Sequence, residues 1–518
     1  RVEVLTRGAG ETGGVRWQSS GEDDYTIADV DGLSRGTQVI LHLQEDALEF
    51  AEDFRLRSVV RKYSDHIGVP VRMIKNDPPA MPDADAADAE DSEADSAGAD
   101  SAGAAVTLEP VNSAKALWTR SRSDVADDEY KEFYKHVSHD FDDPLSWSHN
   151  RVEGKLEYTS LLYLPKRAPF DLYNREAPKG LKLYVQRVFI MDDAEHFMPM
   201  YLRFIKGIVD TNDLPLNISR ELLQSNAAID KMRSGCVKRV LSMLEKMAKN
   251  DAEQYSKFWG EFGQVLKEGL YEDLERKDTL LELARFSNNE NDDLISLEEY
   301  VSTTDKNQKD IYYIAADTKS QALSSPHLEG FKSKGIKVLV MADPIDQFWL
   351  SMAGQFKEMN FVSITQGEID LDNIKSDKKD PKNKDTKKDD VDKKFTNLIA
   401  HLKASLGQNV KDIRLTSKLT DSPACLVADK GDMDVAMENL MKQRDPNYQG
   451  APRILEINPG HALVEKMNKL LSDKKHNNLV DDAGTLLFEQ ARMMEGKLPS
   501  DPTKFAKIMN NFLVKGVS

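Results

Sequence analysis

The chain has 518 residues, 40% of them hydrophobic, and a formal net charge of -18. This length is too great for one hydrophobic core and predicts roughly three or four domains, while the acidic balance argues against nucleic acid, whose phosphates would be repelled. With only two cysteines, no secretion signal and no apolar run as long as a membrane span, we expect a cytoplasmic protein without a disulfide framework or membrane contact.

The first segment, residues 1–76, is expected to be mainly β-structure. Gly-rich turns separate four strand-like runs, which predicts an antiparallel meander, and the apolar spacing from Phe50 to Tyr63 predicts a helix after it. Gly8, Gly10 and Gly13 match the spacing of a dinucleotide-binding loop. That site needs a helix after the glycines, and here another strand, VRWQSS, follows, so we set the dinucleotide interpretation aside.

Two polar segments divide the rest of the chain. From Asp83 to Asp100 the sequence alternates Asp, Glu, Ala and Ser, which predicts a disordered acidic linker within 77–108, together with a return strand. Lys375 to Asp390 is a second run of mixed charge and places a charged linker at 373–395. The expected folded bodies are therefore 1–76, 109–372 and 396–518.

The body 109–372 combines strands and helices. EYTSLLYLP and LKLYVQRVFI are strand-like, a long helix is expected from near Ser219, and a helix-rich stretch runs from Gln254 to Leu283. DIYYIAA and IKVLVMA, with a helical segment between them, predict an α/β layer. In the last body, two amphipathic helices are expected at Asp482–Gly496 and Asp501–Val514.

One arginine at the start of the long helix stands out. Arg220 lies in LPLNISRELLQ, where the first helical turn favours carboxylates over cations. A surface ion pair with Glu221 is one explanation. The other is an anion site, because unpaired N–H groups and a guanidinium together suit a phosphate. The same letters, Asn217 to Ser219, spell a glycosylation acceptor, which the cytoplasmic expectation excludes.

Several long blocks resemble the ninety-kilodalton heat-shock chaperones in their bacterial form. They include YSDHIGVPV, DDPLSWSHNRVEGKLEYTSLLYLPKRAPFDL, LKLYVQRVFIMDDAEHFMP and DLPLNISRELLQ, and the resemblance covers nearly the whole chain. It implies an α+β multidomain fold: an antiparallel-sheet remnant of a GHKL-type ATPase domain, an α/β middle domain, and an α/β C-terminal domain ending in a helical dimerisation bundle.

The resemblance also implies a role in ATP hydrolysis for the arginine at the start of the long helix. In the family an arginine of this SRE segment reaches the γ-phosphate of ATP, bound with Mg²⁺, which makes Arg220 the expected catalytic residue with Gln224 and Asn217 as supporting contacts. Gly36 and Thr37 match the RGT segment at the adenine end of the family's pocket. The catalytic Glu, the DNxxGM motif and the lid do not occur in this chain, which therefore looks truncated and is expected to be inactive alone.

Two further segments match places where the family contacts client proteins. Phe348 takes the position of the family's client-contacting aromatic, with Trp349 beside it, and one of the two rings could equally be core. DMDVAMENLMKQ places methionines and a leucine at helical spacing, which alone would suggest a core helix. The family's matching helix projects into the dimer cleft. The expected client contacts there are Met433, Met437 and Leu440.

Three functions compete. The first is an ATP-driven molecular chaperone that binds unfolded or partly folded clients, forms a homodimer through its C-terminal helices and cooperates with other chaperones. The second is an ATP-independent dimeric holdase. The third is a related DNA-acting ATPase of the gyrase or mismatch-repair type, against which the acidic balance counts. No metal site is expected beyond the Mg²⁺ of ATP.

Overall fold

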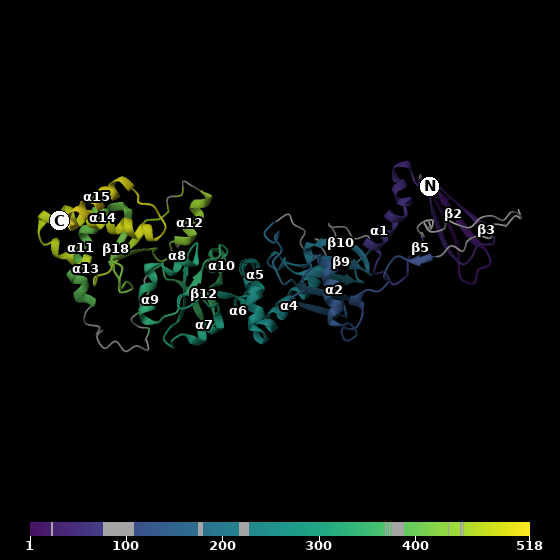
Figure 1. The fold of residues 1–518 in the computed structure, drawn as a ribbon, viewed down its shortest axis with the longest axis horizontal. Helices are drawn as coiled ribbons and strands as arrows, with labels where there is room; N and C mark the ends of the chain where they lie inside the picture. The colour runs from purple at the N-terminus through teal and green to yellow at the C-terminus, as the bar shows by residue number, and fades with distance from the viewer. Residues whose placement is uncertain are drawn as a thin grey trace, which may run out of the picture.

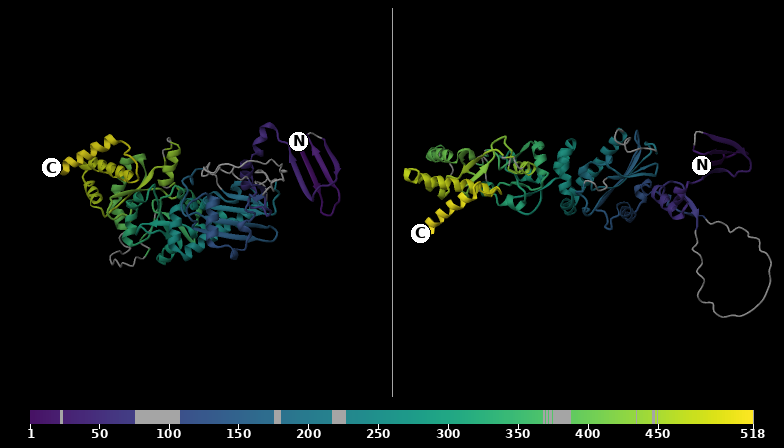
Figure 2. Two further views of the ribbon diagram at one scale, coloured as in Figure 1. Left: turned by 45° about the vertical axis from the view of Figure 1, so that its right-hand side comes forward. Right: turned by 90° about the horizontal axis from the view of Figure 1, so that it is seen from above.

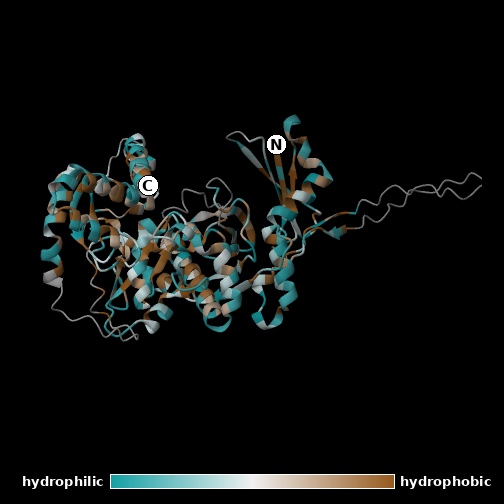
Figure 3. Ribbon diagram, turned by 60° about the vertical axis from the view of Figure 1, so that its left-hand side comes forward, coloured by the Kyte–Doolittle hydropathy of each residue, from teal (hydrophilic) through white to brown (hydrophobic). Residues whose placement is uncertain are grey.

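The computed structural model describes residues 1–21, 24–75, 108–174, 180–216, 227–367, 369, 371, 374, 388–433, 435–445, 448 and 450–517. The folded parts follow one another along the long axis of the molecule in Figures 1 and 2, from the N-terminal sheet to the C-terminal helices. Hydrophobic residues gather in the strands and on inward helix faces, as the brown positions of Figure 3 show. The chain is thus an α+β protein of several domains.

The N-terminal body is a four-stranded antiparallel sheet with a short helical segment after it. The predicted strands are present, but the order is β3-β2-β1-β4, so the prediction of a meander is wrong for the last strand. Its elements are β1 (Val2–Arg7), β2 (Gly14–Ser19), β3 (Tyr25–Val30), β4 (Gly36–Leu41), η1 (Glu45–Ala51) and α1 (Asp53–Tyr63).

The fourth strand crosses to the free edge of β1 because the β3–β4 loop runs over the end of the sheet. Leu33 of that loop packs on Gly14, where a Cβ atom would lie 2.6 Å from a Leu33 methyl carbon. Alternation of apolar and polar residues predicts a strand, but it does not determine which other strand it pairs with. The glycines at 8, 10 and 13 lie in the loop between antiparallel strands β1 and β2, consistent with setting the dinucleotide site aside.

A two-stranded ribbon connects this body to the next. β5 (Arg72–Ile74) pairs with β6 (Leu108–Pro110), the expected return strand. Arg57 of α1 holds the ribbon: its guanidinium binds Asp53 and Glu109 at 2.6 Å each and the carbonyl oxygen of Ile74 at 2.9 Å. The acidic segment 76–107 lies outside the described residues, so the prediction for it stays open.

The middle body begins with a five-stranded sheet, order β10-β9-β11-β8-β7, with helices on both faces. β8 alternates between two cores: Leu161 and Tyr163 pack with α2, whereas Leu162 and Leu164 join the cluster formed with α4 and α5. The elements are α2 (Asp127–Ser138), β7 (Ser146–Val152), β8 (Tyr158–Leu164), β9 (Leu181–Val185), β10 (Val188–Ala194), β11 (Lys206–Thr211), α4 (Ala227–Asn250), α5 (Ala252–Glu272) and α6 (Lys277–Leu283).

The run LKLYVQRVFI is a hairpin and not one strand. Gln186 and Arg187 have positive φ angles of 51° and 67°, which suit a tight two-residue turn normally made by Asn and Gly. Buried Asp210 supports the turn by accepting the Arg187 backbone N–H at 3.1 Å. Since the turn contains neither Gly nor Asn, its sequence carries no local signal.

The second half of the middle body is the expected α/β layer. β14 (Asp310–Ala315) and β15 (Leu339–Met341) are parallel, with α8 (Lys319–Leu323) and α9 (Glu329–Lys334) between them in the chain. They form the centre of a six-stranded sheet, β13-β12-β15-β14-β17-β16. The other elements are β12 (Arg285–Asn288), β13 (Ile295–Ser296), α7 (Leu297–Thr303), α10 (Asp346–Ala353), β16 (Gln355–Phe356) and β17 (Met359–Ser363).

The C-terminal body packs helices against a three-stranded sheet, β18-β20-β19. Its first helix begins at Lys388, within the segment 373–395 expected to be a linker, because Val391 and Phe395 extend the helix's apolar face into the core. Its elements are α11 (Lys388–Leu406), β18 (Val410–Leu415), β19 (Ala424–Val427), α12 (Val435–Arg444), β20 (Arg453–Ile457), α13 (Ala462–Leu470), α14 (Asn477–Met494) and α15 (Pro502–Val517).

Candidate functional site

The expected phosphate-contacting segment lies outside the described residues. Asn217, Arg220 and Gln224 all fall between Leu216 and Ala227, where α4 begins. The helical period predicted beyond them is confirmed, since Ile229 and Met232 are buried in the middle-domain core. The catalytic assignment of these three residues stays a prediction.

Gly36 and Thr37 lie on strand β4 at the edge of the N-terminal sheet. Both are exposed, and the Thr37 hydroxyl bonds to the hydroxyl of Thr6 at 2.8 Å. Gly36 has φ 130°, a conformation that favours glycine. Their partners on β1 are Arg7 and Thr6, which pair with Gly36 and Thr37 in the sheet.

Trp349 is a core residue, and its prediction as a client contact is wrong. Its side chain is fully buried, at 0% exposure, with rings of Phe286 and Phe361 at 6.0 and 5.6 Å. The indole Nε1 donates a hydrogen bond of 2.8 Å to buried Asp346, which also pairs with Lys267. Neighbouring residues on a helix point about 100° apart, so Trp349 faces the core while Phe348 does not.

Phe348 lies on a partly exposed apolar surface at the end of α5 and the outer face of α10. Its ring meets that of Tyr271 edge-on at 6.1 Å. Tyr271 is 49% exposed, Leu274 55% and Met352 42%, a helical turn beyond Phe348. We call these four residues, Phe348, Tyr271, Leu274 and Met352, the aromatic surface. Sequence reasoning identified only Phe348, because Tyr271 comes from a distant helix.

Acidic side chains border the aromatic surface. Glu272 follows Tyr271 in the chain and is exposed, and partial desolvation together with the nearby charge of Glu268 raises the pKa of its carboxyl. Glu275 beside Leu274 is exposed. This arrangement joins exposed rings to negative charge, which favours ligand segments that are both apolar and basic.

The methionine segment divides into two parts. Met433 is 47% exposed and precedes α12, which begins at Val435, so it is not on the predicted helical stripe. Met437 and Leu440 lie on α12 and are half-buried. Between them Glu438 is buried and pairs with Arg453 and Lys442. The helix is therefore attached to its domain through a charged residue that the sequence reasoning did not single out, although a Glu four residues before a Lys is a recognisable helical pair.

The C-terminal helices leave apolar side chains uncovered. Ile508 of α15 is buried and Phe512 packs against the core of the C-terminal body. On other faces Met509, Leu513 and Val514 are 42%, 58% and 71% exposed. An amphipathic helix with this second apolar face has surface that another chain could cover.

The middle and C-terminal bodies are joined by direct hydrogen bonds. Glu329 at the start of α9 accepts the backbone N–H groups of Thr420, Asp421 and Ser422 at 2.8 to 3.1 Å. The Ser422 hydroxyl donates to the same carboxylate at 2.5 Å. Burial opposes ionisation of Glu329, but these bonds outweigh it, and the pKa of the carboxyl is lowered.

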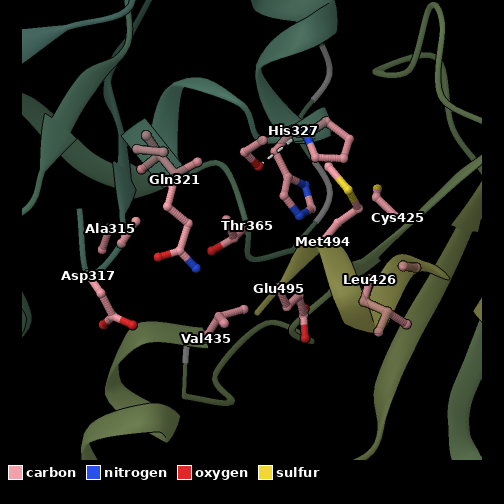
Figure 4. A pocket seen from close by; sticks show the side chains of 16 residues that line it. Ala315, Asp317, Gln321, His327, Thr365, Cys425, Leu426, Val435, Met494 and Glu495 are labelled. Carbon is pink, nitrogen blue, oxygen red and sulfur yellow. Dashed lines mark hydrogen bonds between the residues drawn. The ribbon is translucent and has the colours of Figure 1, made fainter. Parts of the chain in front are cut away.

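A small cavity of about 50 Å³ lies at this junction (Figure 4). His327 of the middle body and Glu495, which follows α14, both line it. His327 Nδ1 and Glu495 Oε1 are buried without a hydrogen-bond partner. Burial lowers the pKa of His327 to about 3, which keeps the imidazole neutral, and burial raises the pKa of Glu495. The cavity is far smaller than a nucleotide but has room for a few water molecules.

Comparison with known proteins places the chain in a family. The family model described as "Hsp90 protein" matches residues 49–518. The chain belongs to the Hsp90 family. It is 46% identical over 519 residues to "Chaperone protein HtpG" of Pseudoalteromonas translucida, and 47% identical to proteins of the same name from Coxiella burnetii and Psychromonas ingrahamii. Each comparison covers 99% of this chain and 78% of the relative.

Membership of the Hsp90 family gives the chain a general function. It is a molecular chaperone of a family that binds ATP, and its relatives are bacterial HtpG proteins. In the described part of the chain, no helix is both long and apolar enough to cross a membrane. Within the same residues, no group of three or more His, Cys, Asp and Glu side chains is arranged to hold a metal ion. Both cysteines, Cys236 and Cys425, are buried free thiols.

The neighbouring rings of α10 give a first test of this site. Trp349→Ala should destabilise the middle domain by about 3–5 kcal/mol, because it empties a fully buried space and removes one of the donors to buried Asp346. Phe348→Ala, at a partly exposed position, should cost about 1 kcal/mol or less. Thermal and urea unfolding of both variants would measure the difference. Equal destabilisation by the two changes would contradict the assignment of Trp349 to the core and Phe348 to the surface.

Proposed function

We propose that this chain binds unfolded or partly folded proteins through the aromatic surface of the middle domain and the Met433–Leu440 segment of the C-terminal domain. The observation that carries the proposal is the exposure of large apolar side chains on helices α5 and α10, Tyr271 and Met352 above all, beside Phe348. Such patches on a folded surface are typical of interaction sites.

The chemistry of these residues suits many different partners. Methionine side chains adapt their shape, and aromatic rings bury a large area at little cost in conformational freedom. The net charge of -18 and the acidic border next to the aromatic surface favour client segments that combine apolar and basic residues. The alternative is an ATP-independent holdase, which binds such segments without hydrolysing ATP. Client binding measured without nucleotide distinguishes that alternative.

Suppression of client aggregation tests the binding surfaces. Phe348→Ala, and separately Met433→Ser with Met437→Ser, should each weaken suppression about three- to tenfold, the effect of losing one contact worth roughly 1 kcal/mol. Light scattering of a heat-denatured client, with and without ATP, would measure it. Phe141→Ala is a matched control, because Phe141 is 96% exposed and follows α2, a helix that lies apart from α10 and α12 in Figure 1. Suppression unchanged by the surface variants but weakened by the control would refute the proposal.

A role in ATP hydrolysis is proposed for the complete protein, one that also carries the remainder of the nucleotide-binding domain. There Arg220 would offset charge on the γ-phosphate of Mg-ATP, with Gln224 and Asn217 in support and Gly36 and Thr37 near the adenine. The support for this proposal is the match of the SRE segment and of RGT to the family.

Hydrolysis by the completed protein tests that assignment. Arg220→Ala should slow phosphate release by roughly one to three decades, the scale for one positioned charge donor, and Gln224→Ala should do less. Lys231→Ala is a suitable control, since Lys231 is an exposed cation early in α4. The present chain alone should show no ATP hydrolysis above background. Normal turnover by the Arg220 variant would remove Arg220 from the catalytic role.

Dimerisation through α14 and α15 is the third part of the proposal. Truncation after Asn478 is a poor test, because α14 supplies buried Val480, Leu487 and Phe488 to the core of the C-terminal body. Point changes on the exposed face of α15 avoid this problem. Met509 and Leu513 are four residues apart, so both lie on one side of the helix.

Met509→Glu with Leu513→Glu should convert a homodimer to monomers, since two buried carboxylates per chain would face their copies across a two-fold interface. Sedimentation velocity would measure the change. Asn511→Glu serves as the control, because it adds a carboxylate on the opposite side of the same helix. A dimer that persists in the double variant would place the interface elsewhere.

A further inference from the structure

A group of buried charges anchors α12 to the C-terminal body. Glu438, near the middle of α12, is 3% exposed and its Oε2 pairs with Arg453 at the start of β20. Its other oxygen accepts a bond of 2.6 Å from Lys442, one turn later on the same helix. Burial opposes ionisation of Glu438, but the bond from Lys442 and the charge of Arg453 outweigh it, and the pKa is lowered. The carboxylate is thus ionised inside the domain.

The same carboxylate reaches the loop between α14 and α15. Lys497 of that loop lies 3.7 Å from Glu438 Oε1 and pairs with Glu495 at 2.8 Å. Glu495 and Arg453 are 8% and 5% exposed, so the pairs are largely removed from water. Arg453 also donates a bond of 2.7 Å to the carbonyl oxygen of Met433, directly before α12. The charges therefore contact both α12 and the segment that leads into it.

The surrounding backbone leaves room for this carboxylate. Gly450, with φ 72°, lies against Glu438, and a Cβ atom there would overlap the Oε1 oxygen. At the same time the network is incompletely satisfied, because Arg453 Nε and Glu495 Oε1 have no hydrogen-bond partner. A buried network of this kind adds little net stability compared with apolar packing, and its better-attested effect is to fix one arrangement of the elements it joins.

We propose that Glu438 and Lys497 are positioning residues, which hold α12 in register with the α14–α15 loop and so couple the Met433–Leu440 client surface to the helices that carry the dimer face. Two observations extend this coupling to the middle domain. Val435 of α12 and Glu495 of the network line the junction cavity, and His327 reaches the same cavity from the middle body (Figure 4). A displacement of the α14–α15 loop would thus be transmitted to α12 through charge pairs and not through the apolar core. The inference rests on the proposed function for its effect on clients, but not for its effect on α12.

Amide hydrogen exchange of the full chain tests the mechanical part. Lys497→Met removes the connecting charge at a position that is partly accessible and should leave the domain folded. We expect the rate of amide exchange in α12 to rise about tenfold, because local opening of the helix then costs less free energy. β18 and β20 should keep their protection. Lys442→Met is the matched control: it removes a cation from the same carboxylate, but from within α12, and should leave the exchange of α12 within about twofold of the parent, because the tie to the loop remains.

A second variant identifies Glu438 as the partner of Lys497. Glu438→Gln should raise exchange in α12 at least as much as Lys497→Met does, because it also weakens the pairs with Arg453 and Lys442. The double variant should exchange like Glu438→Gln alone, because the tie to Lys497 is already lost there. Additive effects, or a rise confined to residues 495–500, would overturn the proposal. A melting curve of each variant shows whether the C-terminal body is folded, and if Glu438→Gln unfolds it, the comparison of Lys497→Met with Lys442→Met still decides.

The functional part is measured separately with a fluorescent, permanently unfolded model client. If α12 is correctly placed in only about a third of Lys497→Met molecules, the apparent Kd should rise about threefold. Loss of α12 protection without any change in Kd would keep the structural coupling and refute its use in client binding. No effect of Met433→Ser with Met437→Ser on Kd would instead refute the proposed client surface, whatever the exchange data show.

Discussion

The orientation of α10 depends on one buried charge. Lys267 of α5 is 4% exposed and binds Asp343 at 2.7 Å and Asp346 at 3.2 Å. Burial alone would lower the pKa of this lysine, but the two carboxylates outweigh it and raise the pKa, so the ammonium stays charged. Asp346 in turn accepts the indole N–H of Trp349. This chain of bonds fixes the rotation of α10, and the rotation decides that Phe348 faces Tyr271 at the surface.

The second proposed client surface follows the same physical rule. α12 is held by Glu438 through Arg453 and Lys497, much as α10 is held by Asp346 and Lys267. In both cases the side chains proposed to contact clients are at least partly exposed, so they hold their own helix less firmly than a buried group would. A charged side chain on the inner face holds the helix more firmly, because a buried carboxylate tolerates few positions and breaking its pairs is costly.

The contacts between domains are likewise polar. Glu329 binds the 420–422 loop, and Lys418 and Arg414 both donate to the carbonyl oxygen of Gly367. Where the contact between two domains is polar and has room for water, its hydrogen bonds can be replaced by hydrogen bonds to water at a modest cost in free energy. A continuous apolar core cannot be opened in this way. The middle and C-terminal bodies therefore keep separate hydrophobic cores while being joined at a defined seam.

The sequence alone determined many of the helices and strands and indicated the family. The helical periods of α4, α5, α14 and α15 and the parallel strands around α8 and α9 follow from apolar spacing, which depends only on local geometry. The family followed from long matching blocks. Arg220 and its neighbours were identified in the same way, and they lie outside the described residues, so only their chemistry and not their placement supports the assignment.

Tertiary structure decided what local patterns leave open. The turn at Gln186–Arg187 depends on Asp210, a residue from another strand, and the position of β4 depends on the path of its loop. Trp349 and Phe348 are adjacent and similarly apolar, so only the packing of α5 against α10 could select the buried ring. Glu438 carried only the helical-spacing signal of its pair with Lys442. Its other two cations come from β20 and the α14–α15 loop, and contacts between distant segments leave no periodic signal in the sequence.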